Sequence, residues 1–385
     1  MRAPRLAVFA LLALVPTVSV AVPAQADPSS LPPAQSIVAA SDEALSPLCD
    51  QFSLDYNATS PIFPLYCWDA QGSNPIESKN NAVCESTRPG TSGAGIDAVS
   101  SSPEFEYGGQ TYRCWDLAFV TRPLTASDPS GLEQDPFAED LLTYSYLPSG
   151  NLPSNLTPLD LRAIYSCNAS LINSSYNGPV TEAEIGGRGT HYVVPVLPLI
   201  GSAVSTQWLT DLGLGGVGVA PCVYNGDYTY NGTEYPIGEN EGTNLVFNPA
   251  DDPYASDVVF PYSGAAYVCF NDTKACAGAS AGSQFNPGSL VLGDISDLAP
   301  LTGPPSDQRI SITTFPPTFI YTQYVDFVGT GTEPYVPTYL RPLLGTDAKG
   351  SGWLCSRQAP ATSEADIAKW GFATAANCGL VTPTP

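Results

Sequence analysis

The segment P-V-L-P-L-I-G-S-A-V-S-T-Q-W-L at residues 195–209 contains the end of an apolar run and a Gly-Ser turn. The whole run, Tyr192–Leu199, is rich in β-branched and apolar residues, which predicts a buried strand. It leads through Gly201 and Ser202 into a helix expected at about 205–212. A strand followed by a turn and a helix is the unit from which α/β proteins are built. This segment therefore predicts that class.

Two further segments support the same class: D-L-A-F-V-T-R-P-L (116–124) and L-R-A-I-Y-S-C-N (161–168). The first contains a strand expected at 115–120. The second ends a helix expected over 157–165, with Thr157 as its cap and Pro158 in its first turn. Additional strands are expected at 62–68 and 141–146, a helix at 41–56, and apolar runs mark 258–270 and 310–324. Since strands alternate with helices, we expect largely parallel sheets.

The first 26 residues have the pattern of a secretory signal peptide. Arg2 and Arg5 form a basic start, Leu6–Val15 an apolar core, and Ala24–Ala26 a small-residue cleavage motif. We expect the mature chain to begin at Asp27. No later run approaches 18 uninterrupted apolar residues, so a membrane span is not expected. Without a cysteine at the cleavage site we expect no lipid anchor, and a secreted protein, extracellular or periplasmic.

The mature chain is large and acidic. It has 359 residues (385 − 26), more than one hydrophobic core usually serves, which predicts two lobes. The formal charge is −23, and about −25 once Arg2 and Arg5 are removed. Such a charge repels nucleic acids and anionic lipids. It does not exclude an anionic ligand, because backbone N–H groups and helix N-termini act locally while distant charges are screened.

Ten cysteines follow the signal peptide, an even number that indicates a disulfide framework. Spacing leaves the connectivity open. The working assignment is Cys49–Cys67, Cys84–Cys114, Cys167–Cys222, Cys269–Cys276 and Cys355–Cys378. The last two of these pairs are preferred because each joins near neighbours beside one element.

The sequence does not predict a metal site, a cofactor or a catalytic centre. It has no C-x-x-C pair and one histidine, His191. A catalytic role for His191 would need an orienting acid and a nucleophile, and no signature specifies either. Glu239 and Glu241 form an acid pair of the kind that glycosidases use. They lie in a Gly/Asn-rich loop of an acid-rich chain, so we expect a protein that is not an enzyme.

The order of several segments resembles that of the extracellular phosphate-binding proteins that feed bacterial ABC importers. The resemblance covers roughly Ser36 to Cys378 and is closest to a secreted, cysteine-bearing branch. It rests on the collinearity of its pieces rather than on any one of them. Besides 116–124 and 161–168, they are A-A-S-D-E-A (39–44), L-Y-C-W-D-A-Q-G-S (65–73), R-P-G-T-S-G-A-G-I (88–96), I-G-S-A-V-S (200–205) and V-V-F-P-Y-S-G-A-A-Y (258–267).

The resemblance implies a two-lobed, periplasmic-binding-protein-like (type II) α/β fold with a two-strand hinge. Lobe I would comprise 27–140 plus 320–385, and lobe II 141–319. A small anionic solute such as phosphate would lie between the lobes, held by helix N-termini. The resemblance further implies a monomer whose partners are the membrane subunits of an ABC importer. Neither nucleic acid nor a membrane span is expected.

The resemblance also implies a ligand-binding set, which is Thr91, Ser92, Thr121, Arg122 and Ser202. This chain departs from the family pattern at several of its positions. Asp42 or Glu43 stands where the family has a small hydroxyl residue, and a carboxylate there would repel a dianion. Thr121 aligns with the family's phosphate-specific aspartate, while apolar residues follow Ser202. These changes would remove charge-assisted hydrogen bonds of roughly 1.5–3 kcal/mol each.

Three functions stay open from the sequence. The first is a solute-binding protein for phosphate or another small oxyanion. The second is a divergent relative that binds a neutral, carbohydrate-like ligand with aromatic residues such as Trp68, Trp115 and Tyr262. The third is a secreted interaction protein whose cleft binds nothing.

Overall fold

The computed structural model describes most of the chain after the expected signal peptide. The segment 1–26 lies outside the described residues, as do residues 199–201 of the Gly-Ser turn. The described residues are 27–198, 202–230, 233–245, 257–273, 275–276, 285–332, 335–346, 352–356 and 362–383.

One 11-stranded sheet runs through the molecule, in the order β11-β10-β14-β8-β19-β7-β1-β2. Three short strands add to β8 beside this path. The strands on the path are β11 (Tyr224–Asn225), β10 (Val194–Leu197), β14 (Val258–Ser263), β8 (Leu132–Tyr146), β19 (Ile320–Val328), β7 (Leu117–Val120), β1 (Ile37–Ser41) and β2 (Leu65–Trp68). Those beside it are β15 (Val291–Leu292), β20 (Ala373–Thr374) and β21 (Thr382–Pro383).

Two parallel groups of strands lie at the ends of this sheet. β1 pairs in parallel with β2 and β7, and β10 pairs in parallel with β14 and β11. Between the groups, β8 and β19 run antiparallel to each other. The sheet is therefore parallel within each group, as expected, and antiparallel at the two strands that join them.

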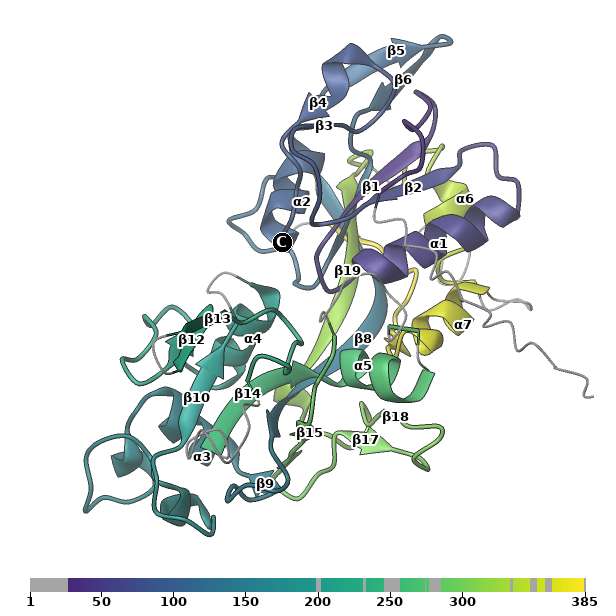
Figure 1. Cartoon of the computed structure of the whole chain (residues 1–385). Helices are drawn as coiled ribbons and strands as arrows, with labels where there is room; N and C mark the ends of the chain where they lie inside the picture. Colours follow the sequence, from purple (N-terminus) through teal and green to yellow (C-terminus); the bar gives the residue numbers. More distant parts are fainter. Residues whose placement is uncertain are drawn as a thin grey trace, which may run out of the picture.

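The 15-residue strand β8 lies between the two groups and pairs with β19 and then with β14. Its first part, up to Leu141, pairs with β19, and the next residues, Leu142 to Ser145, pair with β14. β19 in turn pairs with β7. Figure 1 shows β8 and β19 running side by side between the two parts of the molecule. We call the part built on β1, β2 and β7 the first lobe, and the part built on β10, β11 and β14 the second lobe.

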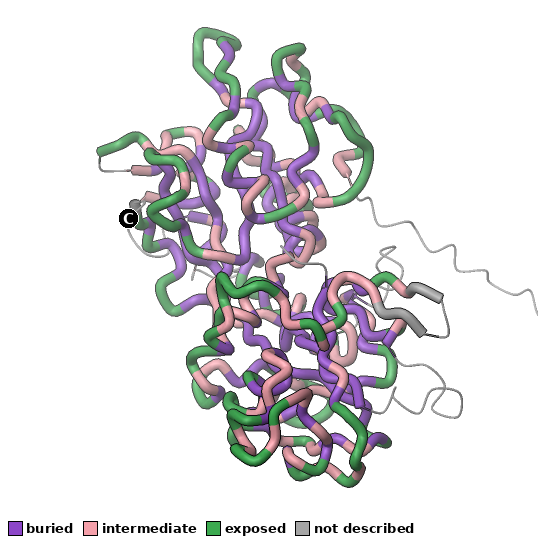
Figure 2. The backbone as a smooth tube through the Cα atoms, turned by 90° about the vertical axis from the view of Figure 1, so that its left-hand side faces the viewer, coloured by how far each residue is buried: buried purple, intermediate pink, exposed green. Residues whose placement is uncertain are grey.

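Helices cover the sheet. In β1, Ile37 and Ala39 belong to one hydrophobic cluster, and Val38 and Ala40 to another. Since alternate side chains of a strand point to opposite faces, the first-lobe sheet is buried on both faces, as parallel sheets are. The two lobes are visible in Figure 2 as separate buried interiors with exposed loops around them. The helices are α1 (Ser46–Ala58), α2 (Ser92–Ser100), α3 (Pro158–Tyr165), α4 (Ala203–Asp211), α5 (Gly264–Val268), α6 (Arg341–Leu344) and α7 (Thr362–Lys369).

Short two-stranded sheets decorate both lobes. Their strands are β3 (Ile76–Glu77) with β4 (Glu85–Ser86), β5 (Glu104–Tyr107) with β6 (Gln110–Arg113), β9 (Asn155–Leu156) with β16 (Asp294–Ile295), β12 (Asp227–Tyr230) with β13 (Thr233–Pro236), and β17 (Leu301–Thr302) with β18 (Arg309–Ile310).

Several expected elements are confirmed and others are divided. The helix at 157–165 is confirmed as α3, where Thr157 and Asp160 form a capping box. The apolar run 258–270 is divided into a strand and a helical segment, because the Ser263 side chain accepts a hydrogen bond from Ala266 N and starts α5. The run 310–324 is also divided, since β18 ends at Ile310 and β19 begins only at Ile320.

All ten cysteines form disulfides, in the five pairs of the working assignment. Each bond stays within one lobe or its flanking segments; Cys49–Cys67, for example, ties α1 to β2. Within the described ranges, no helix combines the length and apolarity that crossing a bilayer requires. The bounds of the two lobes given from sequence stay a prediction.

Candidate functional site

The first-lobe side of the cleft is made at the carboxyl ends of β1 and β7. Asp42 follows β1, Thr121 follows β7, and Ser92 begins α2. The Ser92 hydroxyl lies 3.1 Å from the Thr121 hydroxyl and accepts a hydrogen bond from Thr121 N at 3.0 Å. In open α/β sheets, ligands bind outside the carboxyl ends of the strands. The structure therefore brings two of the predicted residues, Ser92 and Thr121, together at the carboxyl ends of the strands.

The Asp42 carboxylate already occupies this edge. Its Oδ2 accepts hydrogen bonds from both the backbone N and the hydroxyl of Ser92, each at 2.8 Å, and its Oδ1 accepts one from Ala44 N. Burial raises the pKa of Asp42, and these hydrogen bonds oppose the increase. The chain thus places its own acid where a helix N-terminus would hold an oxyanion.

Thr91 and Arg122 have hydrogen-bond partners away from the contact between Asp42 and Ser92. Thr91 is exposed, and its hydroxyl accepts a hydrogen bond from Ala94 N as the cap of α2. The guanidinium of Arg122 binds both carboxylate oxygens of Asp128, at 2.7 and 2.8 Å. This hydrogen-bonded pair raises the pKa of Arg122 and holds the pKa of Asp128 below its usual range. A ligand would have to compete with Asp128 for Arg122.

The second-lobe side repeats the arrangement with a different acid. Ser202 caps α4 by accepting a hydrogen bond from Ser205 N at 3.2 Å. The Glu239 carboxylate accepts a hydrogen bond from Val204 N at 3.2 Å and one from the Ser202 side chain. Burial raises the pKa of Glu239 to about 8, and the charges of Asp42 and Glu43 add to the increase. Acids of the two lobes therefore face one another.

A third carboxylate lies at the start of α5. Asp140, in β8, accepts hydrogen bonds from Ser263 Oγ, Tyr321 Oη and the backbone N of Ala265 and Leu141, at 2.5 to 2.9 Å. The side chain is 1% exposed, and burial raises its pKa against these hydrogen bonds. Sequence analysis missed Asp140, since its partners lie 123 or more residues away along the chain, apart from Leu141.

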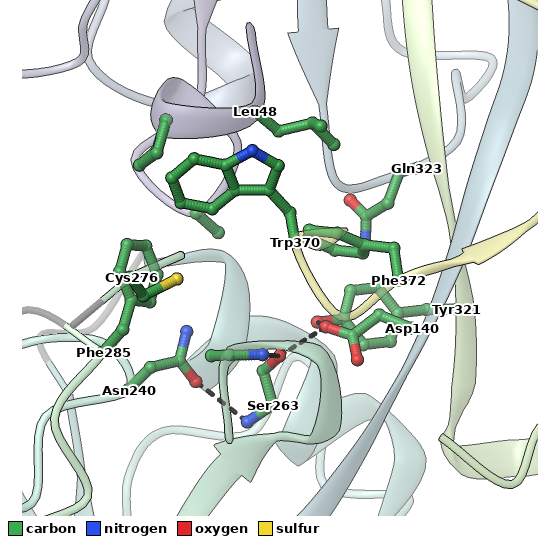
Figure 3. Close-up of a pocket in the computed structure, with 13 residues that line it drawn as sticks. Leu48, Asp140, Asn240, Ser263, Cys276, Phe285, Tyr321, Gln323, Trp370 and Phe372 are labelled. Carbon is green, nitrogen blue, oxygen red and sulfur yellow. Dashed lines mark hydrogen bonds between the residues drawn. The ribbon is translucent and has the colours of Figure 1, made fainter. Parts of the chain in front are cut away.

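A small pocket lies between the lobes, next to Asp140 (Figure 3). The start of α1, the strands β8 and β19, α5 and the segment after α7 form most of its walls. The volume open to a water molecule is about 10 Å³, room for about one water. Its lining residues are Ala44, Pro47, Leu48, Asp140, Asn240, Ser263, Ala266, Cys276, Phe285, Tyr321, Gln323, Trp370 and Phe372.

Three polar atoms in the pocket lining are buried and have no hydrogen-bond partner among the residues that the structure describes: Asn240 Nδ2, Gln323 Oε1 and Trp370 Nε1. Asn240 and Gln323 are each 1% exposed. Asn240 Oδ1 accepts a hydrogen bond from Ser263 N at 2.8 Å, and Figure 3 shows the amide nitrogen pointing the other way. Because leaving buried polar groups unpaired is costly, these atoms indicate a place for a ligand or water that both donates and accepts hydrogen bonds.

The aromatic residues expected to bind a neutral ligand lie elsewhere. Trp68 and Trp115 are packed in a first-lobe hydrophobic cluster, and Tyr262 is fully buried in a second-lobe cluster. Trp370 and Phe372, which sequence analysis did not single out, line the pocket instead. No local sequence pattern marks these two residues, because they reach the cleft only through the packing of the C-terminal segment.

No protein-family model matches the sequence, and no curated protein matches it. Solved structures do match its fold. An ABC-type phosphate transport receptor from Vibrio cholerae is 14% identical, with a TM-score of 0.50, over 88% of this chain and 99% of the receptor. PstS from Borrelia burgdorferi is 12% identical, with a TM-score of 0.45, over 88% and 98% of the two chains.

At these identities only the fold can be compared, and of the two structures just named the Vibrio cholerae receptor has the higher TM-score. The match spans almost the whole receptor, so it includes both lobes and the strands between them. The chain thus has a two-lobed, periplasmic-binding-protein-like α/β fold, and in fold it resembles a phosphate receptor of an ABC importer.

Proposed function

We propose that this chain is a secreted, non-catalytic binding protein that holds a small neutral polar solute between its two lobes. The proposal rests on one observation: three acidic side chains of the protein accept hydrogen bonds from backbone N–H groups at the starts of helices at the cleft. Asp42 lies at the start of α2, Glu239 at α4 and Asp140 at α5. The five disulfides support an extracellular or periplasmic location.

The Asp42 carboxylate disfavours an anionic ligand at the Ser92 turn. An oxyanion that approached Ser92 would have to displace Asp42 from two hydrogen bonds. An ionised Asp42 also repels a second anion at close range, and the repulsion is strongest where water is excluded. A neutral solute avoids this repulsion.

The pocket favours a polar solute of modest size. Asn240 and Trp370 offer N–H donors, Gln323 offers an acceptor, and apolar and aromatic side chains form the rest of the wall. Sites for small molecules commonly combine such apolar walls with a few polar groups. Because the walls come from both lobes, a solute larger than water requires the lobes to separate and close again, as hinged binding proteins do.

Calorimetric titration of the purified mature protein at pH 7.5 tests the proposal. The ligands are phosphate, sulfate and a panel of small sugars and polyols. We expect no heat from phosphate or sulfate and binding of at least one neutral solute. Asn240→Ala and Gln323→Ala should each abolish that binding, while Asn177→Ala, at an exposed position of the second lobe, should preserve it. Micromolar phosphate binding that Asn240→Ala leaves unchanged would refute the proposal.

A second candidate is binding of an oxyanion such as phosphate, with delivery to the membrane subunits of an ABC importer. Its support is the fold likeness together with the Ser92 turn, whose N–H and hydroxyl already hold a carboxylate oxygen. Under this candidate, replacing Asp42 and Glu239 by serine should produce phosphate binding that the unchanged protein lacks. The same titration of the double variant decides between the candidates.

A further inference from the structure

Three side chains that can bind metal ions meet in the second lobe. Glu182, His191 and Asp257 each offer a ligand atom, and these atoms all lie within 4.8 Å of one another. His191 is the only histidine of the chain. Neither a metal nor a cofactor was expected from the sequence.

The fold brings these residues together at the edge of the sheet opposite the cleft. His191 precedes β10 and Asp257 directly precedes β14, and the two strands are parallel neighbours with Val194 opposite Val258. α4 and α5 follow the other ends of these strands (Figure 1). Glu182 begins a 3₁₀ turn, and its N–H donates to the carbonyl of His191 at 2.9 Å. The cluster is therefore separate from the pocket described above.

Both carboxylates of the cluster are completely buried. Glu182 and Asp257 have no exposed surface. Within the described part of the chain, Glu182 Oε2 accepts one hydrogen bond, from His191 N, and Glu182 Oε1 has no hydrogen-bond partner. Among the residues that the structure describes, no lysine or arginine pairs with Glu182. A buried carboxylate in this state is strongly unfavourable, and a bound cation would neutralise it.

The loop after Glu182 is built around its carboxylate. The segment G-G-R-G at 186–189 wraps over the side chain. A Cβ atom at Gly189 would overlap Glu182 Oε2, and one at Gly187 would crowd the carbonyl of Glu182. Glycine at these positions permits the close approach. The buried position of Glu182 is thus a feature of the loop sequence.

The distance between His191 and Asp257 and the ligand chemistry of the cluster fit a tetrahedral ion. Two atoms that are each about 2.0–2.2 Å from a tetrahedral Zn²⁺ lie about 3.4 Å apart. His191 Nδ1 and Asp257 Oδ2 are 3.4 Å apart, which is long for a hydrogen bond. One imidazole with two carboxylates is a ligand set that Zn²⁺ accepts. The His191 side chain is 48% exposed, so water can reach the remaining coordination position.

We propose that Glu182, His191 and Asp257 form a binding site for one divalent transition-metal ion of the zinc class. The ion joins the starts of β10 and β14 to the loop at 182–191 and neutralises two buried carboxylates. Its predicted effect is to stabilise the second lobe, independently of any ligand in the cleft.

The single histidine makes the test specific. Tag-free mature protein, first treated with a chelator and dialysed, is titrated with ZnCl₂ while the imidazole signals of ¹⁵N-labelled histidine are recorded by NMR. We expect one set of signals, which changes until one equivalent of Zn²⁺ has been added. Calorimetry should give one site, and the melting temperature should rise. Imidazole signals that do not respond to one equivalent of Zn²⁺ would overturn the proposal.

Variants separate this site from general binding of cations to an acidic surface. His191→Ala should weaken Zn²⁺ binding by about 100-fold or more, since even residues that only support a metal ligand contribute 10–100-fold. Asp307→Asn removes an acid whose side chain is 65% exposed and should change nothing. Zn²⁺ binding that is equally tight in His191→Ala would refute the site. Glu182→Gln should also lose binding, and if that variant does not fold, the histidine signals of the unchanged protein still decide.

Discussion

Buried acids at the two edges of the second-lobe sheet differ in the number of hydrogen bonds that they accept. At the cleft edge, the Asp140 carboxylate accepts four hydrogen bonds, two of them from backbone N–H groups. At the far edge, the Glu182 carboxylate accepts one from the residues that the structure describes, and its Oε1 accepts none from them. The difference follows from the parallel topology, because helices begin beyond the carboxyl ends of the strands and supply unpaired N–H groups there. The comparison shows that the backbone stabilises a buried acid at one edge, whereas at the other edge the proposed metal ion would have that role.

Replacing Asp140 should have the largest effect on stability. Asp140→Ala leaves the Ser263 and Tyr321 hydroxyls and two backbone N–H groups without their acceptor. Loss of a buried polar network of this kind costs about 3–5 kcal/mol. Urea unfolding followed by circular dichroism measures it. Asp307→Asn, at an exposed acid, is the control and should remain within about 0.5 kcal/mol. If the two variants are equally stable, the hydrogen bonds of Asp140 do not stabilise the fold, and the comparison between the edges is wrong.

The pH dependence should be next in size. Burial raises the pKa of Glu239 to about 8, whereas its ordinary value is 4.5. Between these values Glu239 holds a proton in the folded protein and loses it in the unfolded chain. Its contribution to stability is therefore full below about pH 4.5 and is lost as the pH rises to about 8. Melting temperatures measured from pH 5 to pH 8.5 should fall. Glu239→Gln should flatten the curve, and a curve of unchanged slope would contradict this assignment.

Removing Asp42 should have an intermediate effect. Asp42→Ala leaves the N–H and hydroxyl of Ser92 without their acceptor, at a cost of about 1–3 kcal/mol. Because both groups belong to one contact, Asp42→Ala and Ser92→Ala should not be additive in a double-mutant cycle. Additive effects would show that Asp42 does not act as the anion of this turn.

Arg122→Ala should have the smallest effect. Arg122 is paired with Asp128, and its side chain is 33% exposed, so water screens the ion pair and the loss should be below about 1 kcal/mol. The assignment of Arg122 as an oxyanion ligand stays a prediction. If a protein with Asp42 and Glu239 replaced binds phosphate, comparing that variant with and without Arg122 measures the contribution of the guanidinium directly.

Local sequence patterns predicted the features that depend on near neighbours. The α3 helix follows from Thr157 and Pro158, which act within one turn of the chain. The strand before the Gly-Ser turn follows from the apolar run, and β10 is found inside it at Val194–Leu197. The run at 258–270 was harder to interpret, because its apolar pattern continues through the Ser263 cap from β14 into α5. A continuous apolar run does not by itself distinguish a strand from a buried helix.

The sites depended on contacts that no spacing rule describes. The Ser92 turn was predicted as a ligand-binding position, and the structure shows it holding Asp42. The three polar atoms of the pocket come from Asn240, Gln323 and Trp370, which are far apart in the sequence. Glu182, His191 and Asp257 match no metal-binding motif, because His191 and Asp257 meet only when β10 and β14 pair.

The sequence by itself determined the alternation of strands and helices, the disulfide-rich acidic character of the chain and the presence of Ser/Thr turns at helix starts. These properties arise from composition and from interactions within a few residues. Only the tertiary structure decided which partner each buried acid has. A carboxylate is stabilised by whatever donor or cation lies within about 3 Å, and in this protein the strands that bring those partners together are distant in sequence. For Asp140 the partner is the start of α5, 123 residues farther along the chain.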